Sequence, residues 1–188
     1  GLIGSLFDDE LKGDSSDNIL VGLEGADTLD GASGQDTASY KLSNEAVFID
    51  LGNDILFGGH STGDVLISIE NIDGSVYDDT LIGDNEANVL SGFEGNDSLE
   101  GLVGADTLDG GDGVDTADYS QSDAGVDVDI ASGTGRGGHA TGDVLIDVEN
   151  IQGSEFSDTL GGDDTSNQLL GGQGQDILVG LEGEDTLE

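Results

Sequence analysis

The sequence predicts an all-β fold in which short parallel strands wind into one elongated solenoid. The first observation behind this prediction is a long repeat, whose unit has the length of residues 1–79. Gly25–Asp30, for example, returns one unit later as Gly104–Asp109, and no insertion or deletion breaks the register. The second is a shorter, nonapeptide period inside the long one. The third is that each nonapeptide offers one large aliphatic residue among glycines and polar residues. A fixed period of this kind indicates an array in which each unit buries its apolar face on its neighbour.

The nonapeptide has glycine at its first position, usually glycine at the fourth, aspartate at the sixth and an aliphatic residue at the eighth, as in Gly22–Asp30. Thirteen nonapeptides form three runs, which are Gly4–Ser39, Gly74–Asp118 and Gly153–Glu188. Two matching inserts separate the runs, Tyr40–Asp73 and Tyr119–Gln152. We therefore expect one continuous solenoid of three consecutive units, residues 1–79, residues 80–158 and a partial unit at residues 159–188. The chain begins inside a repeat, which predicts a piece of a longer protein.

The inserts contain their own strand patterns. Val47–Leu51 and Val126–Ile130 alternate apolar and other residues, which is typical of half-buried strands. Val65–Ile69 and Val144–Val148 are more apolar and predict second strands, with a glycine-rich loop before each. We expect the inserts to form wider coils that continue the solenoid.

Glycine determines how a nonapeptide turns. Because glycine accepts left-handed backbone angles, the first six positions can turn tightly and aim carbonyl oxygens inward. The last three, such as Thr28–Asp30, form a short strand in which only the middle side chain points into the core. Two nonapeptides then complete one flattened coil with turns at opposite edges. Sixth positions that are two nonapeptides apart are therefore predicted to lie side by side.

These stacked sixth positions are the candidate metal ligands. Carboxylate and carbonyl oxygens are hard donors, and Ca²⁺ takes six to eight of them in flexible geometry. The alternative, that the Gly and Asp clusters are solvated turns, is disfavoured by the common register of thirteen units. Seven pairs have this spacing within the runs: Asp9 with Asp27, Asp79 with Asp97, Asp97 with Asp115, Asp158 with Asp176, Asn18 with Asp36, Asn88 with Asp106, and Asn167 with Asp185.

The nonapeptides resemble the repeats of haemolysin-type calcium-binding (RTX) proteins, whose pattern is G-G-x-G-x-D-x-U-x with U a large aliphatic residue. The inserts resemble the R-modules of secreted bacterial mannuronan epimerases and related exoproteins, through Thr116–Ser120, Ala124–Ile130, Gly142–Leu145 and Val148–Ser154. The RTX resemblance implies a right-handed parallel β-roll with Ca²⁺ in the seven gaps. It also implies that carbonyl groups of the glycine turns complete each site, namely those around Gly22, Gly25, Gly31, Gly34, Gly92, Gly95, Gly101, Gly104, Gly110, Gly113, Gly171, Gly174, Gly180 and Gly183.

Charge makes folding dependent on a cation. The chain has 42 acidic residues against three basic ones, a formal net charge of −39, and no Trp. The negative charges of such a chain repel one another, so its composition predicts that the chain is disordered when no metal is bound. One buried aliphatic residue per nonapeptide does not offset the entropy of ordering the unit, so bound Ca²⁺, about seven ions or more, must contribute folding free energy. The same charge excludes nucleic acid as a partner.

Other recurrent residues carry weaker hypotheses. His60 and His139 lie among glycines, each with one Asp four positions on, which favours a turn or packing role over a zinc site. Four acidic residues of the inserts are equally compatible with extra calcium ligation and with no such role: Asp64, Asp143, Glu70 and Glu149. No G-x-S-x-G elbow or other nucleophile and base constellation is present, so we expect a module without catalytic activity.

The sequence has no Cys, no Pro and no apolar stretch of the roughly 18 residues that a membrane span requires. These features and the RTX resemblance predict a secreted, monomeric module that is exported by type I secretion, has no membrane span, and stabilises neighbouring domains of a larger parent chain. Two alternatives remain open. One is an R-module that binds the polysaccharide alginate; the other is a stalk segment of an RTX adhesin.

Overall fold

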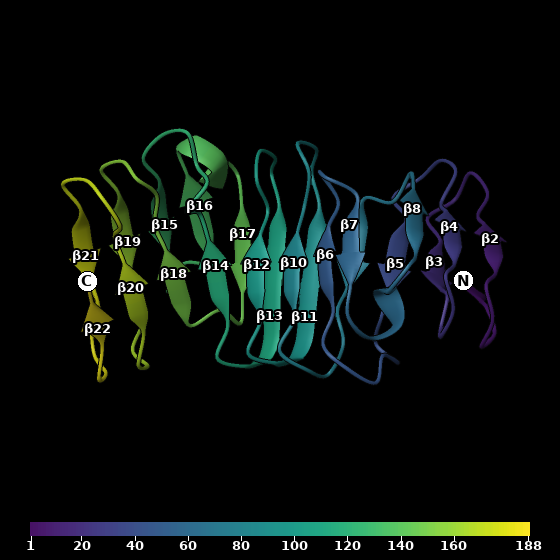
Figure 1. Ribbon diagram of the computed structural model, residues 1–188. Coiled ribbons are helices and arrows are strands. Elements are labelled where there is room, and N and C mark those ends of the chain that lie inside the picture. Colours follow the sequence, from purple (N-terminus) through teal and green to yellow (C-terminus); the bar gives the residue numbers. More distant parts are fainter.

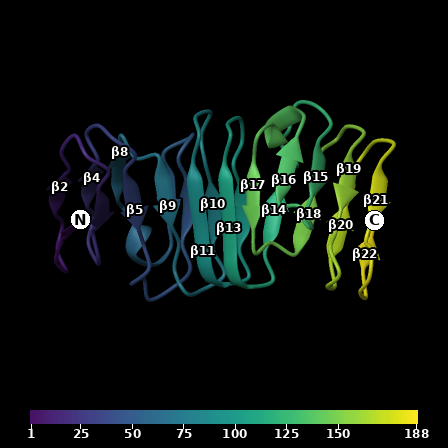
Figure 2. The same cartoon turned by 180° about the vertical axis from the view of Figure 1, so that it is seen from behind.

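The computed structural model describes residues 1–188, and the chain winds into an elongated roll of stacked coils whose two termini lie at opposite ends (Figures 1 and 2). The strands run across the long axis of the roll. The only helical segments are two short 3-10 turns, η1 (Gly59–Ser61) and η2 (Gly138–Ala140). The structure contains no helix with the length and apolar character that crossing a membrane requires.

Three sheets form the two layers of the roll. The largest has eleven strands in the order β1 (Leu2–Ile3), β3 (Ile19–Val21), β5 (Thr37–Ser39), β9 (Asn71–Asp73), β11 (Val89–Gly95), β13 (Thr107–Gly113), β17 (Val144–Ile146), β16 (Thr134–Arg136), β15 (Asp127–Asp129), β19 (Thr159–Gly161) and β21 (Ile177–Val179). The second has eight, in the order β22 (Thr186–Leu187), β20 (Gln168–Leu170), β18 (Asn150–Gln152), β14 (Thr116–Asp118), β12 (Ser98–Glu100), β10 (Thr80–Ile82), β6 (Phe48–Asp50) and β7 (Ile55–Phe57). The third has three strands, β2 (Glu10–Lys12), β4 (Thr28–Asp30) and β8 (Val65–Ile67).

Strand pairing within the runs is parallel and has the predicted offset of two nonapeptides. Leu20 pairs with Leu2, and Leu99 pairs with Leu81. Consecutive nonapeptides alternate between the two layers, so two of them make one coil. The all-β parallel roll expected from the repeats is therefore confirmed.

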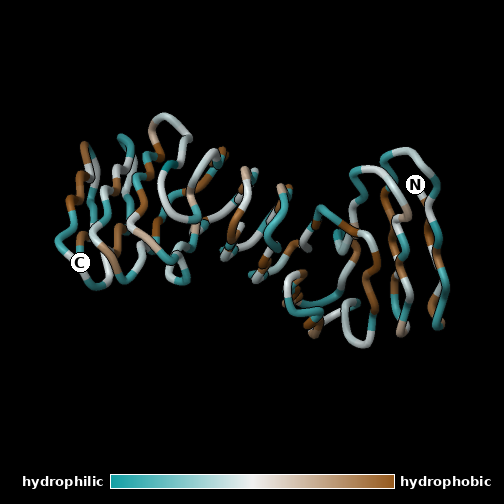
Figure 3. The backbone as a smooth tube through the Cα atoms, turned by 90° about the horizontal axis from the view of Figure 1, so that it is seen from above, coloured by the Kyte–Doolittle hydropathy of each residue, from teal (hydrophilic) through white to brown (hydrophobic).

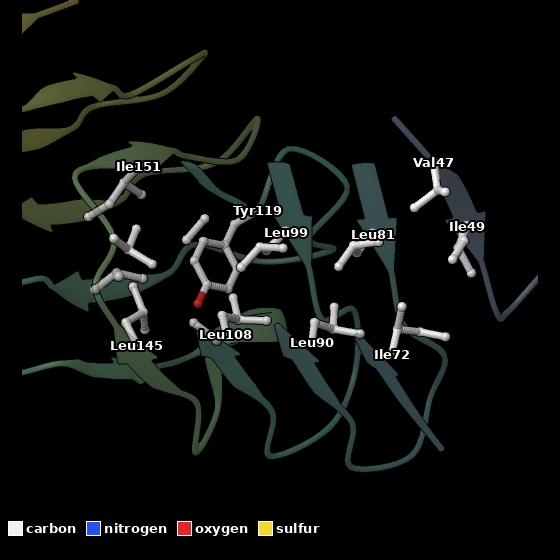
Figure 4. Packing of buried hydrophobic residues seen from close by; sticks show 14 of the residues in the cluster. Val47, Ile49, Ile72, Leu81, Leu90, Leu99, Leu108, Tyr119, Leu145 and Ile151 are labelled. Atoms are coloured by element: carbon white, nitrogen blue, oxygen red, sulfur yellow. The ribbon is translucent and has the colours of Figure 1, made fainter. Parts of the chain in front are cut away.

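The core is a file of eighth-position side chains. Leu81, Leu90 and Leu99 are completely buried, and Figure 4 shows Leu81 and Leu99 of one layer facing Ile72, Leu90 and Leu108 of the other. Burying one such side chain contributes about 1.5–3 kcal/mol. The strands carry the hydrophobic residues, while the turns at the edges are mostly polar or glycine (Figure 3). In most three-residue strands of the runs the middle residue is the buried one, although β5 and β12 also bury their third residues, Ser39 and Glu100.

The inserts continue the sheets. Strand β5 pairs with β9, which ends the first insert, and β4 pairs with β8 inside that insert. The strand pattern from Val47 onward forms β6, with Val47 and Ile49 buried, and β6 pairs forward with β10. The second insert repeats this with β15 and β19.

Two details differ from the sequence predictions. Strands β7 and β16 pair antiparallel with β6 and β15 just ahead of the loop segments, where no strand was expected. Strands β11 and β13 are longer than the predicted three-residue strands, because their glycine turns also pair, Phe93 with Gly111 and Gly95 with Gly113. This contact requires glycine, since a Cβ on Gly113 would collide with the carbonyl oxygen of Gly95.

Candidate metal centre

Hydrogen bonds join the sixth positions into ladders along both edges of the roll. The backbone N–H of Asp79 donates to Oδ1 of Asp97, and the N–H of Asp97 donates to Oδ1 of Asp115, each at 2.7 Å. The same bond, at 2.7–3.0 Å, joins the other five predicted pairs, Asp9 with Asp27, Asn18 with Asp36, Asn88 with Asp106, Asp158 with Asp176 and Asn167 with Asp185. The structure thus brings all seven pairs together.

The second carboxylate oxygen has no such partner inside the ladders. Oδ2 is buried without any hydrogen bond in five aspartates, Asp27, Asp36, Asp97, Asp106 and Asp115. These residues are at most 2% exposed. A buried ionised oxygen without a partner is costly, and native structures pair such charges or bind metal with them. Each of these five atoms therefore requires a cation or a proton.

Burial also changes the acidity of these groups. It raises the pKa of Asp97 and of Asp106 to about 7, and in Asp97 the negative charges of Asp79 and Asp115 act in the same direction. Burial likewise raises the pKa of Asp27 and Asp115. A bound cation reverses this effect, because it favours the ionised form.

First-position glycines leave room for oxygen atoms beside each carboxylate. A Cβ on Gly22 would collide with Oδ2 of Asp27, and one on Gly92 would lie 2.7 Å from the carbonyl oxygen of Gly110. The sixth-position aspartate crowds the other first-position glycines predicted to serve the sites in the same way, namely Gly31, Gly101, Gly110, Gly171 and Gly180. Carboxylate and carbonyl oxygens therefore gather at one place in the turn, a donor set that suits Ca²⁺.

Fourth-position glycines serve the turn in another way. Gly25 and Gly95 have φ of 144° and 129°, in the region that favours glycine, and each packs on the backbone carbonyl of the turn before it. Gly34, Gly174 and Gly183 share the positive φ; Gly104 and Gly113 do not, but both lie against a carbonyl oxygen in the same way. These contacts fix the stacking distance between turns.

Each run begins with a serine cap, which the sequence analysis missed. Ser154, at the second position of its nonapeptide, donates its backbone N–H to Oδ2 of Asp158 at 2.7 Å and its hydroxyl to Oδ1 at 2.8 Å. Ser75 makes the same two bonds to Asp79, and Ser5 donates both groups to Oδ2 of Asp9. The first aspartate of every run is therefore already supplied with donors. A Gly-Ser pair at the start of each run was the available sequence clue.

The insert acids terminate the ladders. The N–H of Asp27 donates to Oδ1 of Asp64 at 2.9 Å, and the buried Tyr40 hydroxyl donates to Oδ2 of Asp64 at 3.0 Å. Asp143 receives the same bonds from Asp106 and Tyr119 at 3.0 Å each. Burial raises the pKa of both insert aspartates to about 6.

Glu70 and Glu149 take the equivalent place on the opposite edges. Each accepts a backbone N–H through Oε2, from Asp36 at 2.9 Å and from Asp115 at 2.8 Å. The four acids whose role the sequence left open are therefore members of the ladders. Sequence spacing concealed them, because the inserts place them 34 or 37 residues from their partners.

Side chains alone do not complete a metal site anywhere in the chain, since no three His, Cys, Asp or Glu groups converge. His60 and His139 lie in η1 and η2, and their backbone N–H groups donate to Ser43 and Ser122. A calcium site in the ladders would therefore combine one or two carboxylates with backbone carbonyl groups.

Comparison with protein families agrees with this geometry. The model of the RTX calcium-binding nonapeptide repeat matches four times, at residues 3–38, 73–108, 91–121 and 149–187, together more than half of the chain. The chain therefore belongs to the RTX calcium-binding repeat family, and it is a calcium-binding β-roll module. A search of curated proteins found no match.

Proposed function

We propose that this chain is a module that folds on extracellular Ca²⁺ and thereby holds and stabilises neighbouring domains of a larger secreted protein. The observation that carries the proposal is the set of buried Oδ2 atoms without partners, which lie in the glycine turns of the ladders. Ca²⁺ bound there supplies the positive charge that these oxygens lack. The seven gaps predict at least seven ions.

The chain itself prepares these positions. The ladder N–H groups hold each Oδ1, which leaves Oδ2 directed at the first-position glycine of its own turn. Without cations, a charge of −39 opposes compaction, and burial of the ladder carboxylates adds to that cost. Folding and ion binding are therefore one process, as in other small metal-dependent domains. A chain of this kind stays unfolded where calcium is scarce, and RTX proteins typically fold outside the cell.

A calcium titration followed by far-UV circular dichroism and hydrodynamic radius tests the proposal, with Mg²⁺ as the control. We expect an expanded, largely unstructured chain in excess chelator and a compact β protein at sub-millimolar to millimolar Ca²⁺. Mg²⁺ should not substitute, because it requires tight octahedral geometry and gives up water reluctantly. Identical spectra and radius in chelator and in Ca²⁺ would refute calcium-dependent folding.

We also propose that the module has no catalytic activity and little affinity for acidic polysaccharide. Two of its three basic side chains are already engaged: Lys12 pairs with Asp30, and the Lys41 ammonium lies 3.3 Å from the ring centre of Phe93. Arg136 remains. Titration with alginate oligomers at millimolar Ca²⁺ tests the point, and saturable micromolar binding at the loops 58–63 and 137–142 would favour the R-module alternative.

One observation favours a second function, that of a stalk. The termini lie at opposite ends of the elongated roll, so copies joined in tandem would extend it (Figure 1). Small-angle scattering of a tandem dimer in Ca²⁺ tests this. The maximum dimension should nearly double relative to the single module, whereas an unchanged value would mean that the copies fold back on each other.

A further inference from the structure

Glu100 is a buried acid outside the ladders. It occupies the ninth position of its nonapeptide, at the end of β12, and its side chain is nearly inaccessible, with the residue 6% exposed. Oε2 accepts a hydrogen bond from the Gln121 amide at 3.0 Å. Oε1 is buried and has no partner at all. Neither the repeat pattern nor the ladders account for this atom.

Asp118 lies next to Glu100 at the same position of the neighbouring strand β14. Ser98 and Leu99 pair in parallel with Thr116 and Ala117, so the two acids follow side by side on the same face. Adjacent strands are about 4.8 Å apart, which brings the two carboxylates within reach of one ion. Oδ1 of Asp118 accepts the N–H of Ser120 at 2.8 Å, and no hydrogen bond engages its Oδ2.

A third acid, Asp50, adds negative potential from β6. Its own oxygens accept two bonds from Asn53, each at 2.9 Å, so it stays in place without being a ligand. Burial raises the pKa of Glu100 to about 7, and the charges of Asp118 and Asp50 contribute.

We propose that Glu100 and Asp118 form a lateral calcium site on the second sheet, in which Oε1 of Glu100 and the free oxygen of Asp118 bind one ion and Gln121 positions the glutamate. Two carboxylates balance one divalent charge, which removes the cost of the unpartnered oxygen. This site differs from the ladders, which use sixth positions at the edges of the roll.

The lateral site occurs once in the chain. The corresponding residues of the first unit are Val21, Ser39 and Leu42, which offer no carboxylate. Because the first unit forms the corresponding strands β3 and β5 with these residues, they define a variant whose backbone the fold already accommodates.

The test counts Ca²⁺ ions bound at saturation, by native mass spectrometry and equilibrium dialysis. Glu100→Gln, Asp118→Asn and the double exchange Glu100→Val with Asp118→Ser, which installs the first-unit residues, should each bind one ion fewer than the parent chain. Their circular dichroism in Ca²⁺ should stay unchanged. Glu10→Gln, which alters an exposed acid on β2, is the matched control and should bind the parental number.

An unchanged ion count in the folded variants would overturn the lateral site and indicate that Glu100 is simply protonated. Should the single variants fail to fold, the double exchange still decides. The reverse exchange, Val21→Glu with Ser39→Asp and Leu42→Gln, should add one ion. The proposal would also be overturned if this variant gained no ion and the double exchange lost none. Failure of the ladder sites would appear differently, as a parent chain whose folding does not depend on Ca²⁺.

Discussion

Asp97→Asn is the most direct perturbation of the ladders, because this residue belongs to two of the stacked pairs. An asparagine Oδ1 can still accept the N–H of Asp79, and the residue's own N–H can still donate to Asp115. The change therefore preserves the ladder and removes only the negative charge at the buried Oδ2. Any effect on calcium dependence then reports on the charge and not on the turn.

The magnitude follows from the coupling of ions to folding. Losing a contact to a charged group costs about 1.5–3 kcal/mol. If the loss of about 3 kcal/mol is shared by roughly seven ions that bind as the chain folds, each ion loses about 0.4 kcal/mol, which raises the calcium midpoint roughly twofold. At the two gaps that Asp97 borders, the affinity should together fall by about 10- to 100-fold.

The assay is a calcium titration by circular dichroism, with calorimetry to resolve individual sites. Asp14→Asn is the control, since Asp14 is exposed at a second position and accepts only the N–H of Ser16 within its own turn. Asn88→Asp should shift the midpoint the opposite way, because it adds a charge to a gap that has one carboxylate. A midpoint for Asp97→Asn equal to that of Asp14→Asn would show that the ladder carboxylates do not bind calcium.

Three further predictions concern the ends of the ladders and their protons. Ser154→Ala removes the hydroxyl donor to Asp158 and should lower the free energy of unfolding in saturating Ca²⁺ by about 1–3 kcal/mol, measured by urea denaturation. Tyr119→Phe leaves one oxygen of Asp143 without its donor and should cost about the same in the same assay. In chelator, burial raises the pKa of two ladder aspartates from 3.8 to about 7, so the folded form binds protons more tightly than the unfolded chain. This contribution to stability is fully present below about pH 4 and is lost as the pH rises through about 7. Circular dichroism in chelator should therefore show more β structure at pH 5 than at pH 8.

The controls use residues of the same type in open positions. Ser132→Ala removes an exposed hydroxyl that is hydrogen-bonded to the Thr134 hydroxyl and the Asp129 carbonyl oxygen but to no carboxylate. Tyr77→Phe changes a ring that is 44% exposed and whose hydroxyl makes no hydrogen bond. Neither should alter the urea midpoint appreciably. Equal losses in the variants and their controls would argue against the caps, and a spectrum in chelator that is independent of pH would argue against buried ladder carboxylates.

Periodicity was sufficient to predict the regular part of the molecule. Every nonapeptide has one aliphatic side chain and glycines in fixed positions, and this pattern is compatible with one backbone path. In that path the aliphatic side chains point into the core, as Leu81, Leu90 and Leu99 do. The offset of two nonapeptides between stacked aspartates follows from the same geometry. Wherever the repeat is unbroken, the spacing along the sequence therefore predicts which residues are neighbours in space.

The inserts were less predictable because their contacts depend on backbone pairing. Strand β16 contains Thr134, Gly135 and Arg136, which show no apolar alternation, and it forms because its backbone pairs with β15. The Tyr119 bond to Asp143 spans 24 residues, and the buried Glu100 depends on a neighbour from the next insert. None of these partners shares a spacing with the repeat.

The residues that depart from the repeat pattern have a common effect, which is to reduce unpaired negative charge at the ends of the ladders. A serine at the second position supplies donors to the first aspartate of every run, and the second nonapeptide of every run has a neutral asparagine at its sixth position. At the far end, the tyrosine hydroxyls and backbone N–H groups supply both oxygens of the insert aspartates. Among the ladder acids, the buried oxygens without partners are therefore those of Asp27, Asp36, Asp97, Asp106 and Asp115, which lie between these closed ends. Because the ends are closed by hydrogen bonds, a run can begin or stop without an incomplete ion site, and the requirement for calcium grows with the number of interior turns.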